Sequence, residues 1–466
     1  MPSTNASQPF KHIGVVGAGS MGSMMVLAFA EIGLDVSVWD VEKANIEKIA
    51  DMSKKATTSK AKVEGFTDLK KFTKNLEGQN IDDRKLFMFS VTHGPPADSI
   101  LGMLKCDLQK GDIIIDGGNE NYRRTERRQK ECKAMGVDWI GMGVSGGYHG
   151  DAKAIALVMP FLEQYAAKAP KDGTPCVTRI GPDGSGNVVK MVHNGTEGGL
   201  LSALAEACSL MHYGMEMDYA QIGEIFTTKK TSEGDEKGEG ASMNNGTPLW
   251  SLMEAADRHV SCPTLAAVHW MRIASGNRGE RQHVAERLKI PAPKPIGSSM
   301  DQKTLVEKLR RAVYATFLAS FCQGLELIAR ASEDEGWEIN MADCLQIWRA
   351  GYIIESEHIA DLLQPALAEK PVKNMKVFDS VSQELHSNYE PLKEIVVQGA
   401  MTDQYIPSIT ATLEYLKYEG GVIIPTKFME AQMDYFGAHG YNKPGIPGED
   451  PGPVKKGPHH YEWKAA

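Results

Sequence analysis

A glycine-rich turn near the N-terminus restricts the possible folds of this chain more than any other feature. Residues 17–22 read Gly-Ala-Gly-Ser-Met-Gly, after a short apolar run at 13–16 and before a helical pattern at 21–32. Glycines at this spacing permit a tight turn, close backbone approach to a pyrophosphate, and close packing of helix on strand. The helix N-terminus adds N–H groups and positive partial charge for phosphates. We therefore predict a dinucleotide site rather than a glycine turn without a ligand, with cofactor contacts at Gly17, Gly19, Ser20, Met21 and Gly22.

The acidic residue that such a site requires is Asp40. It ends the next strand-like run, 36–39, about 20 residues beyond the glycines. A carboxylate at this position accepts hydrogen bonds from ribose hydroxyls and repels a 2′-phosphate. Val41 and Glu42 supply no cation for that phosphate, although Lys43 is near. The expected cofactor is NAD in preference to NADP, and a solvated loop aspartate is the alternative interpretation of Asp40.

The N-terminal part alternates β-branched runs with helical patterns, which is typical of a parallel sheet with crossover helices. Further strands are predicted at 86–91 and 113–115, and loops at 118–119 and 141–150. In an open α/β sheet the ligand lies beyond the carboxyl ends of the strands. Val91, at the end of one such strand, is therefore a further expected cofactor contact.

Beyond residue 184 the pattern becomes helical. We predict one long helix at 187–213 and another at 305–331, where apolar residues recur at mostly helical spacing. Residues 232–245 predict a polar loop, and the Pro/Gly-rich stretch 442–460 cannot form a core alone. The expected fold is α/β plus all-α. It comprises a Rossmann-type doubly wound domain (1–185), a large helical domain (186–440) and an extended tail (441–466).

Composition excludes several other classes of protein. The 466 residues carry a formal charge of −9, which argues against nucleic acid or an anionic membrane as the partner. The seven cysteines are scattered without a Cys-x-x-Cys pair, as expected of reduced thiols rather than disulfides or a metal site. The N-terminus lacks an apolar signal core, and no apolar run approaches the length of a membrane span. A cytoplasmic protein is therefore expected.

The run at 190–197 is the strongest candidate for chemistry. In a helix, Lys190, His193 or Asn194, and Glu197 share one face at spacings of three, four and seven. That face collects an amine, an amide and a carboxylate within reach of one small ligand. A solvated helix face is the alternative, but the neighbouring valines at 188, 189 and 192 indicate a largely buried helix.

A second element is the small-residue run Ser145, Gly146 and Gly147, which follows a strand-like segment. Small residues at such a position bring a hydroxyl and backbone N–H groups against a carboxylate. An ordinary tight turn is the alternative, because the run is a weak signal by itself.

These motifs resemble those of the 6-phosphogluconate dehydrogenase family, and the resemblance extends over nearly the whole chain. The shared order of the motifs argues against coincidence. The similar runs are residues 17–22, 112–119, 143–147, 190–195, 314–315 with 323–324, 336–337, 347–351 and 431–439.

The resemblance implies a mechanism. Lys190 takes the proton of the substrate 3-hydroxyl while hydride passes from C3 to the nicotinamide, which requires a lowered lysine pKa. The resulting β-keto acid loses CO2, and Glu197 protonates C1 of the enediol. The carboxylate and hydroxyls are held by Ser145, Gly146, Gly147, His193 and Asn194, with Asn119 close to both nicotinamide and substrate.

The resemblance also implies a homodimer in which each tail reaches the active site of the partner subunit. In this chain His439 and the terminal Pro/Gly-rich segment are similar to those elements. The substrate is then a small sugar acid, held between residues of two subunits.

The departures from the family cluster on its phosphate-binding residues. The family uses a tyrosine after the catalytic glutamate, a Lys-Gly-Thr loop and two arginines. Here Gly198 replaces the tyrosine and Met433 the late arginine, residues 275–279 match the loop poorly, and 290–303 look shortened. Losing charge-assisted partners weakens phosphate binding. Either Arg278, Arg281 or Lys427 compensates, or the substrate is an unphosphorylated or otherwise altered aldonate; the sequence favours the second, with decarboxylation retained.

Two other functions stay open at this point. One is a β-hydroxyacid dehydrogenase of the 3-hydroxyisobutyrate type, which oxidises without decarboxylation. The other is a catalytically idle NAD-binding regulator. The long helical region and Glu197 favour the decarboxylating branch, and the presence of both Lys190 and Glu197 argues against an idle protein.

Overall fold

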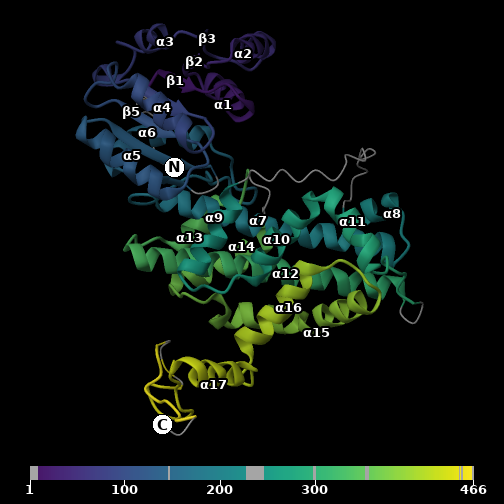
Figure 1. Ribbon diagram of the computed structural model, residues 1–466. Coiled ribbons are helices and arrows are strands. Elements are labelled where there is room, and N and C mark those ends of the chain that lie inside the picture. Colours follow the sequence, from purple (N-terminus) through teal and green to yellow (C-terminus); the bar gives the residue numbers. More distant parts are fainter. Residues whose placement is uncertain are drawn as a thin grey trace. The chain divides into compact units, whose positions relative to one another are not determined.

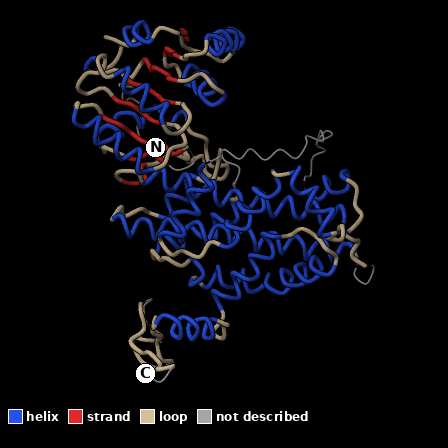
Figure 2. Tube along the Cα trace, viewed as in Figure 1, coloured by secondary structure: helices blue, strands red, loops and turns tan. Residues whose placement is uncertain are grey.

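The computed structural model describes residues 9–144, 147–226, 246–297, 301–351, 356–450, 452 and 455–463. The chain divides into two compact units, Met1–Leu413 and Glu414–Ala466. In the first unit, strands occur only in the N-terminal part of the described residues, and helices make up the rest (Figure 2).

One eight-stranded sheet forms the centre of the N-terminal part (Figure 1). Its strands lie in the order β3-β2-β1-β4-β5-β6-β7-β8; the first six are parallel, and β7 is antiparallel to β6. The strand order reverses between β1 and β4, so the ligand crevice of a doubly wound sheet lies there. The strands are β1(His12–Val16), β2(Asp35–Trp39), β3(Val63–Phe66), β4(Leu86–Phe89), β5(Ile113–Asp116), β6(Asp138–Gly143), β7(Gly147–His149) and β8(Arg179–Gly181).

Helices cover both faces of this sheet, which explains the unbroken apolar runs of its strands. Ile113 and Ile115 face the core that contains Phe29 and Phe161, whereas Ile114 faces the opposite core with Phe72. The predicted doubly wound architecture is confirmed. Its helices are α1(Ser20–Glu31), α2(Lys43–Lys55), α3(Leu69–Asn75), α4(Pro95–Leu104), α5(Tyr122–Ala134) and α6(Ala152–Tyr165).

The loop predicted at 141–150 is wrong for most of its length. Residues 141–143 belong to β6, and Gly141 pairs with His149 of β7. A Cβ added at Gly141 would lie 1.8 Å from Nε2 of the His149 ring. The glycine therefore makes room for a buried ring within the sheet rather than marking a turn.

The helical part is organised around two long helices. α12 packs on α7 and on α15, and α7 also contacts β6, β7 and β8 of the sheet. Small residues let the helices approach: a Cβ at Gly324 would lie 2.3 Å from Thr196 Oγ1. The predicted loop at 232–245 lies outside the described residues. The helices are α7(Ser185–Ser209), α8(Tyr219–Phe226), α9(Gly246–Asp257), α10(Pro263–Gly276), α11(Arg278–Leu288), α12(Gln302–Glu335), α13(Met341–Ile347), α14(Glu357–Glu369), α15(Asp379–Met401) and α16(Pro407–Gly420).

One described helix, α12, is long and apolar enough to cross a membrane, contrary to the expectation that no run approaches this length. Of its most apolar window, 72% is buried inside the chain. That burial is typical of a core helix, whose apolar surface packs on neighbouring helices.

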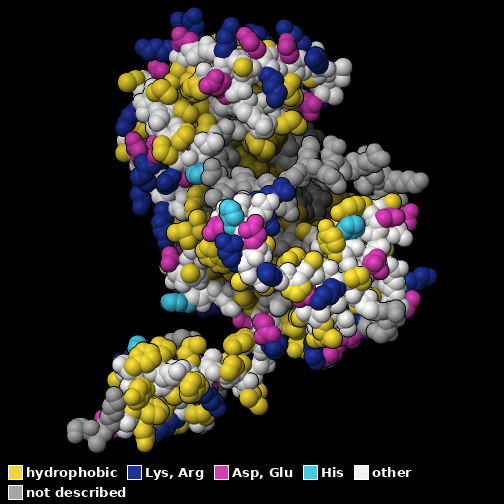
Figure 3. Space-filling model, turned by 45° about the vertical axis from the view of Figure 1, so that its right-hand side comes forward, with side chains coloured by type: hydrophobic (Ala, Val, Ile, Leu, Met, Phe, Trp, Pro, Cys, Tyr) yellow, Lys and Arg dark blue, Asp and Glu magenta, His cyan; other side chains and the backbone are white. Residues whose placement is uncertain are grey.

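The second unit contains α17(Thr426–Gly437) and the C-terminal segment. The carboxylate of Asp434 is fully buried and accepts hydrogen bonds from Gly440 N (3.0 Å), Tyr461 N (3.0 Å), His460 Nδ1 (2.8 Å) and Trp463 Nε1 (3.0 Å). The Pro/Gly-rich tail is therefore fastened to α17. Many apolar side chains remain on the surface of this unit, where yellow predominates in Figure 3; Phe428 and Phe436 are each 72% exposed.

Candidate active site

The glycine loop between β1 and α1 contains glycines of two kinds. Gly17 has φ +96°, and a Cβ there would lie 2.4 Å from Ser90 O; a Cβ at Gly22 would lie 1.9 Å from Gly17 O. A Cβ at Gly19 would meet nothing within 4 Å. The fold itself requires Gly17 and Gly22, whereas Gly19 leaves space that a pyrophosphate fits. No side chain caps the N-terminus of α1, and Ser20 and Met21 are exposed there, so this end of α1 suits a dinucleotide.

This contrast leads to a paired prediction. Gly22→Ala is expected to lower the melting temperature and weaken cofactor binding more than about tenfold, because its Cβ overlaps Gly17 O. Gly19→Ala is expected to keep the melting temperature and weaken cofactor binding alone, because its Cβ enters only the ligand's space. Calorimetry and NADH fluorescence titration measure the two quantities. Equal destabilisation by both variants would contradict the assignment.

Asp40, directly after β2, is buried rather than solvated, so the alternative of a solvated loop aspartate is wrong. Its Oδ2 accepts a hydrogen bond from Ala18 N at 2.7 Å, and Oδ1 accepts one from Glu42 N at 2.8 Å. The carboxylate thereby ties the end of β2 to the glycine loop. The nearby cation Lys43 lies 3.1 Å from Glu47 in an exposed ion pair.

The turns after β1, β4 and β5 meet at one edge of the sheet. A Cβ at Gly17 would lie 3.1 Å from Val91 Cγ1, and one at Gly118 would lie 2.8 Å from Val91 O. Asn119 follows Gly118 and is exposed. Val91 and Asn119 therefore border the same crevice as the glycine loop.

A buried arginine lies behind the Asn119 turn. Arg128 is fully buried and contacts Asp98 Oδ1 at 2.7 Å, Glu120 Oε2 at 2.8 Å and Asp116 Oδ2 at 3.5 Å. Burial raises the pKa of Asp116 to about 6, although Arg128 opposes this shift. These contacts anchor the residues on both sides of Asn119.

Helix α7 brings the predicted chemical residues together. Burial lowers the pKa of Lys190 to about 8, while the charge of Glu197 acts in the opposite direction. Burial raises the pKa of Glu197, against the effects of Lys190 and Arg272. Burial and the neighbouring Lys190 lower the pKa of His193 to about 3. The helix thus carries an amine that is easily deprotonated, a carboxyl that is easily protonated and a neutral imidazole.

Hydrogen bonds orient the amide and the imidazole. His193 Nδ1 lies 3.2 Å from Asn194 Oδ1 and 3.8 Å from Glu197 Oε2, and its ring meets that of Trp348 edge-on at 5.6 Å. Asn194 Nδ2 donates to Thr247 Oγ1 at 2.7 Å. These side chains share one environment, as a common helix face predicts.

The remaining predicted site residues belong to other parts of the chain than α7. Ser145 and Gly146 lie outside the described residues, and Gly147 begins β7 with φ +72°. A Cβ at Gly147 would lie 2.5 Å from Ile180 Cγ1, so packing also requires this glycine. His439 lies in the second unit, next to Gly440, whose N–H is bound by Asp434.

Sequence reasoning missed two residues near α7, Thr247 and Arg272. Thr247 contacts Asn194, so the pair Gly246-Thr247 is a better counterpart of the family's Lys-Gly-Thr loop than residues 275–279. The latter form the exposed end of α10 and start of α11. Arg272 is recognisable only from its proximity to Glu197.

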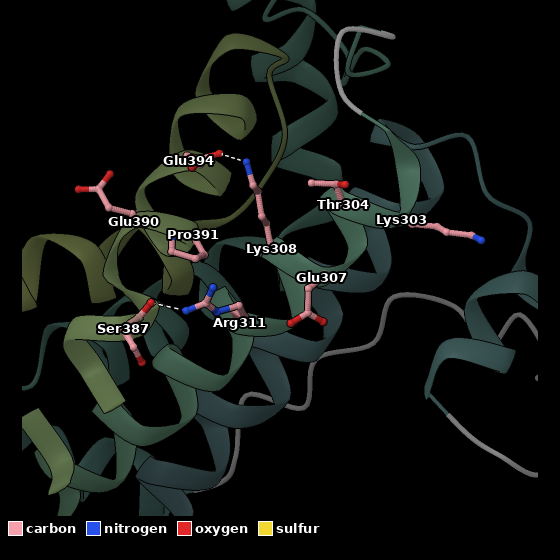
Figure 4. Close-up of a pocket in the computed structure, with 9 residues that line it drawn as sticks. All are labelled: Lys303, Thr304, Glu307, Lys308, Arg311, Ser387, Glu390, Pro391 and Glu394. Atoms are coloured by element: carbon pink, nitrogen blue, oxygen red, sulfur yellow. Dashed lines mark hydrogen bonds and ion pairs between the residues drawn. The ribbon is translucent and has the colours of Figure 1, made fainter. Parts of the chain in front are cut away.

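A separate cleft of about 610 Å³, lined mostly by charged residues, lies between α12 and α15 (Figure 4). Its cations and carboxylates balance: Lys308 pairs with Glu394, and Arg311 donates to Ser387 O. The cleft contains none of the predicted site residues and has no excess charge for a sugar acid.

A dinucleotide loop on a doubly wound sheet, together with a helix that carries a lysine of lowered pKa, defines a nicotinamide-dependent oxidoreductase. Two family models match the chain. The NAD binding domain of 6-phosphogluconate dehydrogenase matches residues 12–172, and its C-terminal domain matches residues 186–236 and 239–463. The chain belongs to the 6-phosphogluconate dehydrogenase family.

Individual relatives agree. The chain is 58% identical to a decarboxylating 6-phosphogluconate dehydrogenase of Emericella nidulans, over 96% of this chain and 100% of the relative. It is 30% identical to the Klebsiella pneumoniae enzyme, over 97% and 99% of the two chains. Among solved structures, 6-phosphogluconate dehydrogenase of Plasmodium falciparum superposes with a TM-score of 0.83 at 26% identity, over 97% and 100% of the two chains.

Proposed function

We propose that this protein catalyses the NAD(P)-dependent oxidative decarboxylation of 6-phosphogluconate. The observation that carries the proposal is the half-buried Lys190, with a pKa of about 8, on one helix with Glu197. General bases act best when their pKa lies near the working pH. The extent of the similarity to decarboxylating relatives favours this reaction over simple β-hydroxyacid oxidation or an idle regulator.

Each residue of α7 has a role that its environment suits. Neutral Lys190 accepts the proton of the 3-hydroxyl; a nicotinamide cofactor held at the glycine loop would supply the acceptor for the hydride of C3. The same lysine, now protonated, stabilises charge that develops on the 3-oxygen as CO2 leaves. Glu197, whose pKa is raised by burial, donates a proton to C1 of the enediol, which is the carbon numbered C2 in the substrate. His193 and Asn194, with the Ser145–Gly147 run, hold the hydroxyls and the carboxylate.

A cation for the terminal phosphate is available in Arg272. It is exposed on α10 and close enough to Glu197 to affect the pKa of that carboxyl. Thr247 adds a hydroxyl beside Asn194. These residues support a phosphorylated substrate, although Gly198 and Met433 remove two side chains that the family uses.

NAD is the proposed preferred cofactor. A carboxylate at Asp40 favours free ribose hydroxyls over a 2′-phosphate, and Lys43, the nearest cation in sequence, already has an acidic neighbour. The matched family model is an NAD binding domain, whereas the similar Plasmodium falciparum enzyme was solved with NADP+, so Asp40 is the feature that favours NAD in this chain.

The proposed assembly is a cytoplasmic homodimer in which each tail, including His439, completes the partner's site. Every described residue of α11 is exposed, among them Val284 and Leu288, and the second unit has its own exposed apolar surface. Exposed apolar surface of this kind is typical of contact regions between subunits.

Initial rates with 6-phosphogluconate and gluconate, each with NAD and with NADP, test these proposals. The expected result is rapid NADH formation from 6-phosphogluconate with one CO2 released per NADH. Activity on gluconate alone would show that the altered phosphate site marks a new substrate. NADH without CO2 would identify a non-decarboxylating dehydrogenase, and preference for NADP would contradict the interpretation of Asp40.

A further inference from the structure

Helix α9 has a buried polar stripe along one face. Thr247, Ser251 and Glu254 lie on α9, and Arg258 directly follows its last residue; the four residues are spaced by four, three and four, and Arg258 N donates to Glu254 O at 2.9 Å. None of these residues is more than 7% exposed. Buried polar groups are costly unless they are paired, so a continuous stripe of them calls for an explanation.

The N-terminal end of the stripe is bound to α7. Thr247 Oγ1 accepts the hydrogen bond from Asn194 Nδ2 at 2.7 Å. Ser251 Oγ donates to the carbonyl of Met191, the residue after Lys190. A Cβ at Gly195 would lie 3.1 Å from Ser251, so the two helices are in close contact.

The other end of the stripe is bound to the start of α5. Arg123 Nη1 contacts Glu254 Oε1 at 2.6 Å, and Arg258 Nη2 donates to Tyr122 Oη at 3.1 Å. Tyr122 is the first residue of α5, three residues after Asn119, and its ring also meets that of Trp337 edge-on.

Arg258 joins this end to α12 as well. Its guanidinium donates to Glu254 Oε2 at 3.0 Å, to Glu335 Oε1 at 2.7 Å and to Asp334 Oδ2 at 3.0 Å. Glu254 is almost wholly buried, and its carboxylate is compensated by both Arg258 and Arg123, so losing the Arg258 contact would leave Arg123 as its cationic partner.

We propose that Glu254 and Arg258 are positioning residues for hydride transfer. The stripe fixes the separation between the Asn119 turn, on the cofactor side, and α7, which carries Lys190. This inference rests on the proposed roles of α7 and Asn119. It assigns a function to side chains that are not expected to touch substrate or cofactor. Small errors in such a separation are costly: displacements of about 1 Å reduce rates by about 100-fold.

The test compares Glu254→Gln and Arg258→Lys with the wild-type enzyme. The expected result is a fall in kcat of about 10- to 100-fold, with KM for substrate and cofactor changed less than about threefold. With substrate deuterated at C3, the isotope effect on kcat should increase, because hydride transfer becomes slower than product release. Unchanged kcat and isotope effect in a folded Glu254→Gln protein would overturn the proposal.

A second measurement does not depend on turnover. Hydrogen exchange of the free protein should accelerate together in residues 117–123 and 187–197 of the Glu254→Gln protein. Acceleration confined to α9 would show a local structural role and contradict the proposal. Tyr122→Phe, which keeps the ring on Trp337 and removes only one hydroxyl, provides a milder variant that is expected to shift the isotope effect in the same direction.

Arg330→Gln is the matched control. Arg330 contacts Asp334 Oδ1 at 2.9 Å within α12, so its removal alters the same carboxylate without touching α9. It should leave kcat and the isotope effect unchanged; an effect equal to that of Arg258→Lys would refute the role of α9. Turnover and CO2 release by the wild-type protein are measured first, so failure of the proposed reaction is distinguished from failure of this inference.

Discussion

Lys190→Met is expected to lower kcat by about 10²- to 10⁴-fold, which is the usual contribution of a general base. Methionine approximates the length and the apolar stem of lysine, so α7 should keep its packing. The amine that accepts the hydroxyl proton is lost, whereas the dinucleotide loop lies on other elements. Cofactor binding, measured by NADH fluorescence, should therefore stay at the wild-type value.

The pH dependence provides an independent check on the lysine. The base must be neutral to act, and burial lowers the pKa of Lys190 to about 8. In the wild-type enzyme kcat/KM should rise about tenfold per pH unit below this value and level off above it. Lys190→Arg is the control: its side chain stays cationic throughout, so it should be inactive at every pH. A Lys190→Met protein with more than a tenth of wild-type activity would exclude Lys190 as the base.

Glu197→Gln is expected to produce the second largest loss, about 10²-fold or more in kcat. The amide has no acidic proton to give to C1 of the enediol, so conversion of the enediol to the final product should slow more than hydride transfer. Rapid mixing should then show an initial burst of NADH followed by a slow steady state. Equal slowing of both steps would place Glu197 in substrate binding instead.

The same substitution changes the pH profile in a defined direction. The negative charge of Glu197 raises the pKa of Lys190 and so opposes the effect of burial. Removing that charge should lower the lysine pKa further. The acidic limb of kcat/KM should therefore move to lower pH, and a shift to higher pH would show that the two groups do not interact as the structure indicates.

The elements that the structure places where the sequence predicts them are determined by local geometry. The glycine loop depends on turns and contacts between adjacent elements, and the α7 residues depend on the 3.6-residue helical period. Both patterns are contained within short segments, so the sequence predicts the strand, the helix and the shared face of Lys190 and Glu197, whereas the role of Lys190 as base stays a prediction.

The errors have a different physical origin. The glycine at 141 accommodates the ring of His149 across a strand pair, which composition alone does not reveal. Thr247 contacts Asn194, although the two residues are 53 positions apart in the sequence. Arg272 approaches Glu197 from another helix, α10. Such pairings arise from the packing of α7, α9 and α10. The composition of the Pro/Gly-rich tail does not reveal its attachment to the buried carboxylate of Asp434 on α17, because that contact joins residues 26 and 29 positions apart.

The different environments of the glycines at 17, 19 and 22 also predict which of these positions would accept substitutions if the protein no longer had to bind its cofactor. Mutations at Gly17 and Gly22 would still be removed by selection for a folded protein, because any side chain there would overlap a neighbouring backbone oxygen. Gly19 has no such protection, since a methyl group there meets only open space. In a descendant that kept the fold but abandoned its cofactor, position 19 would be the first of the three to accept alanine or serine. Substitution at position 19 therefore tests cofactor binding separately from folding, which the other two glycines do not allow.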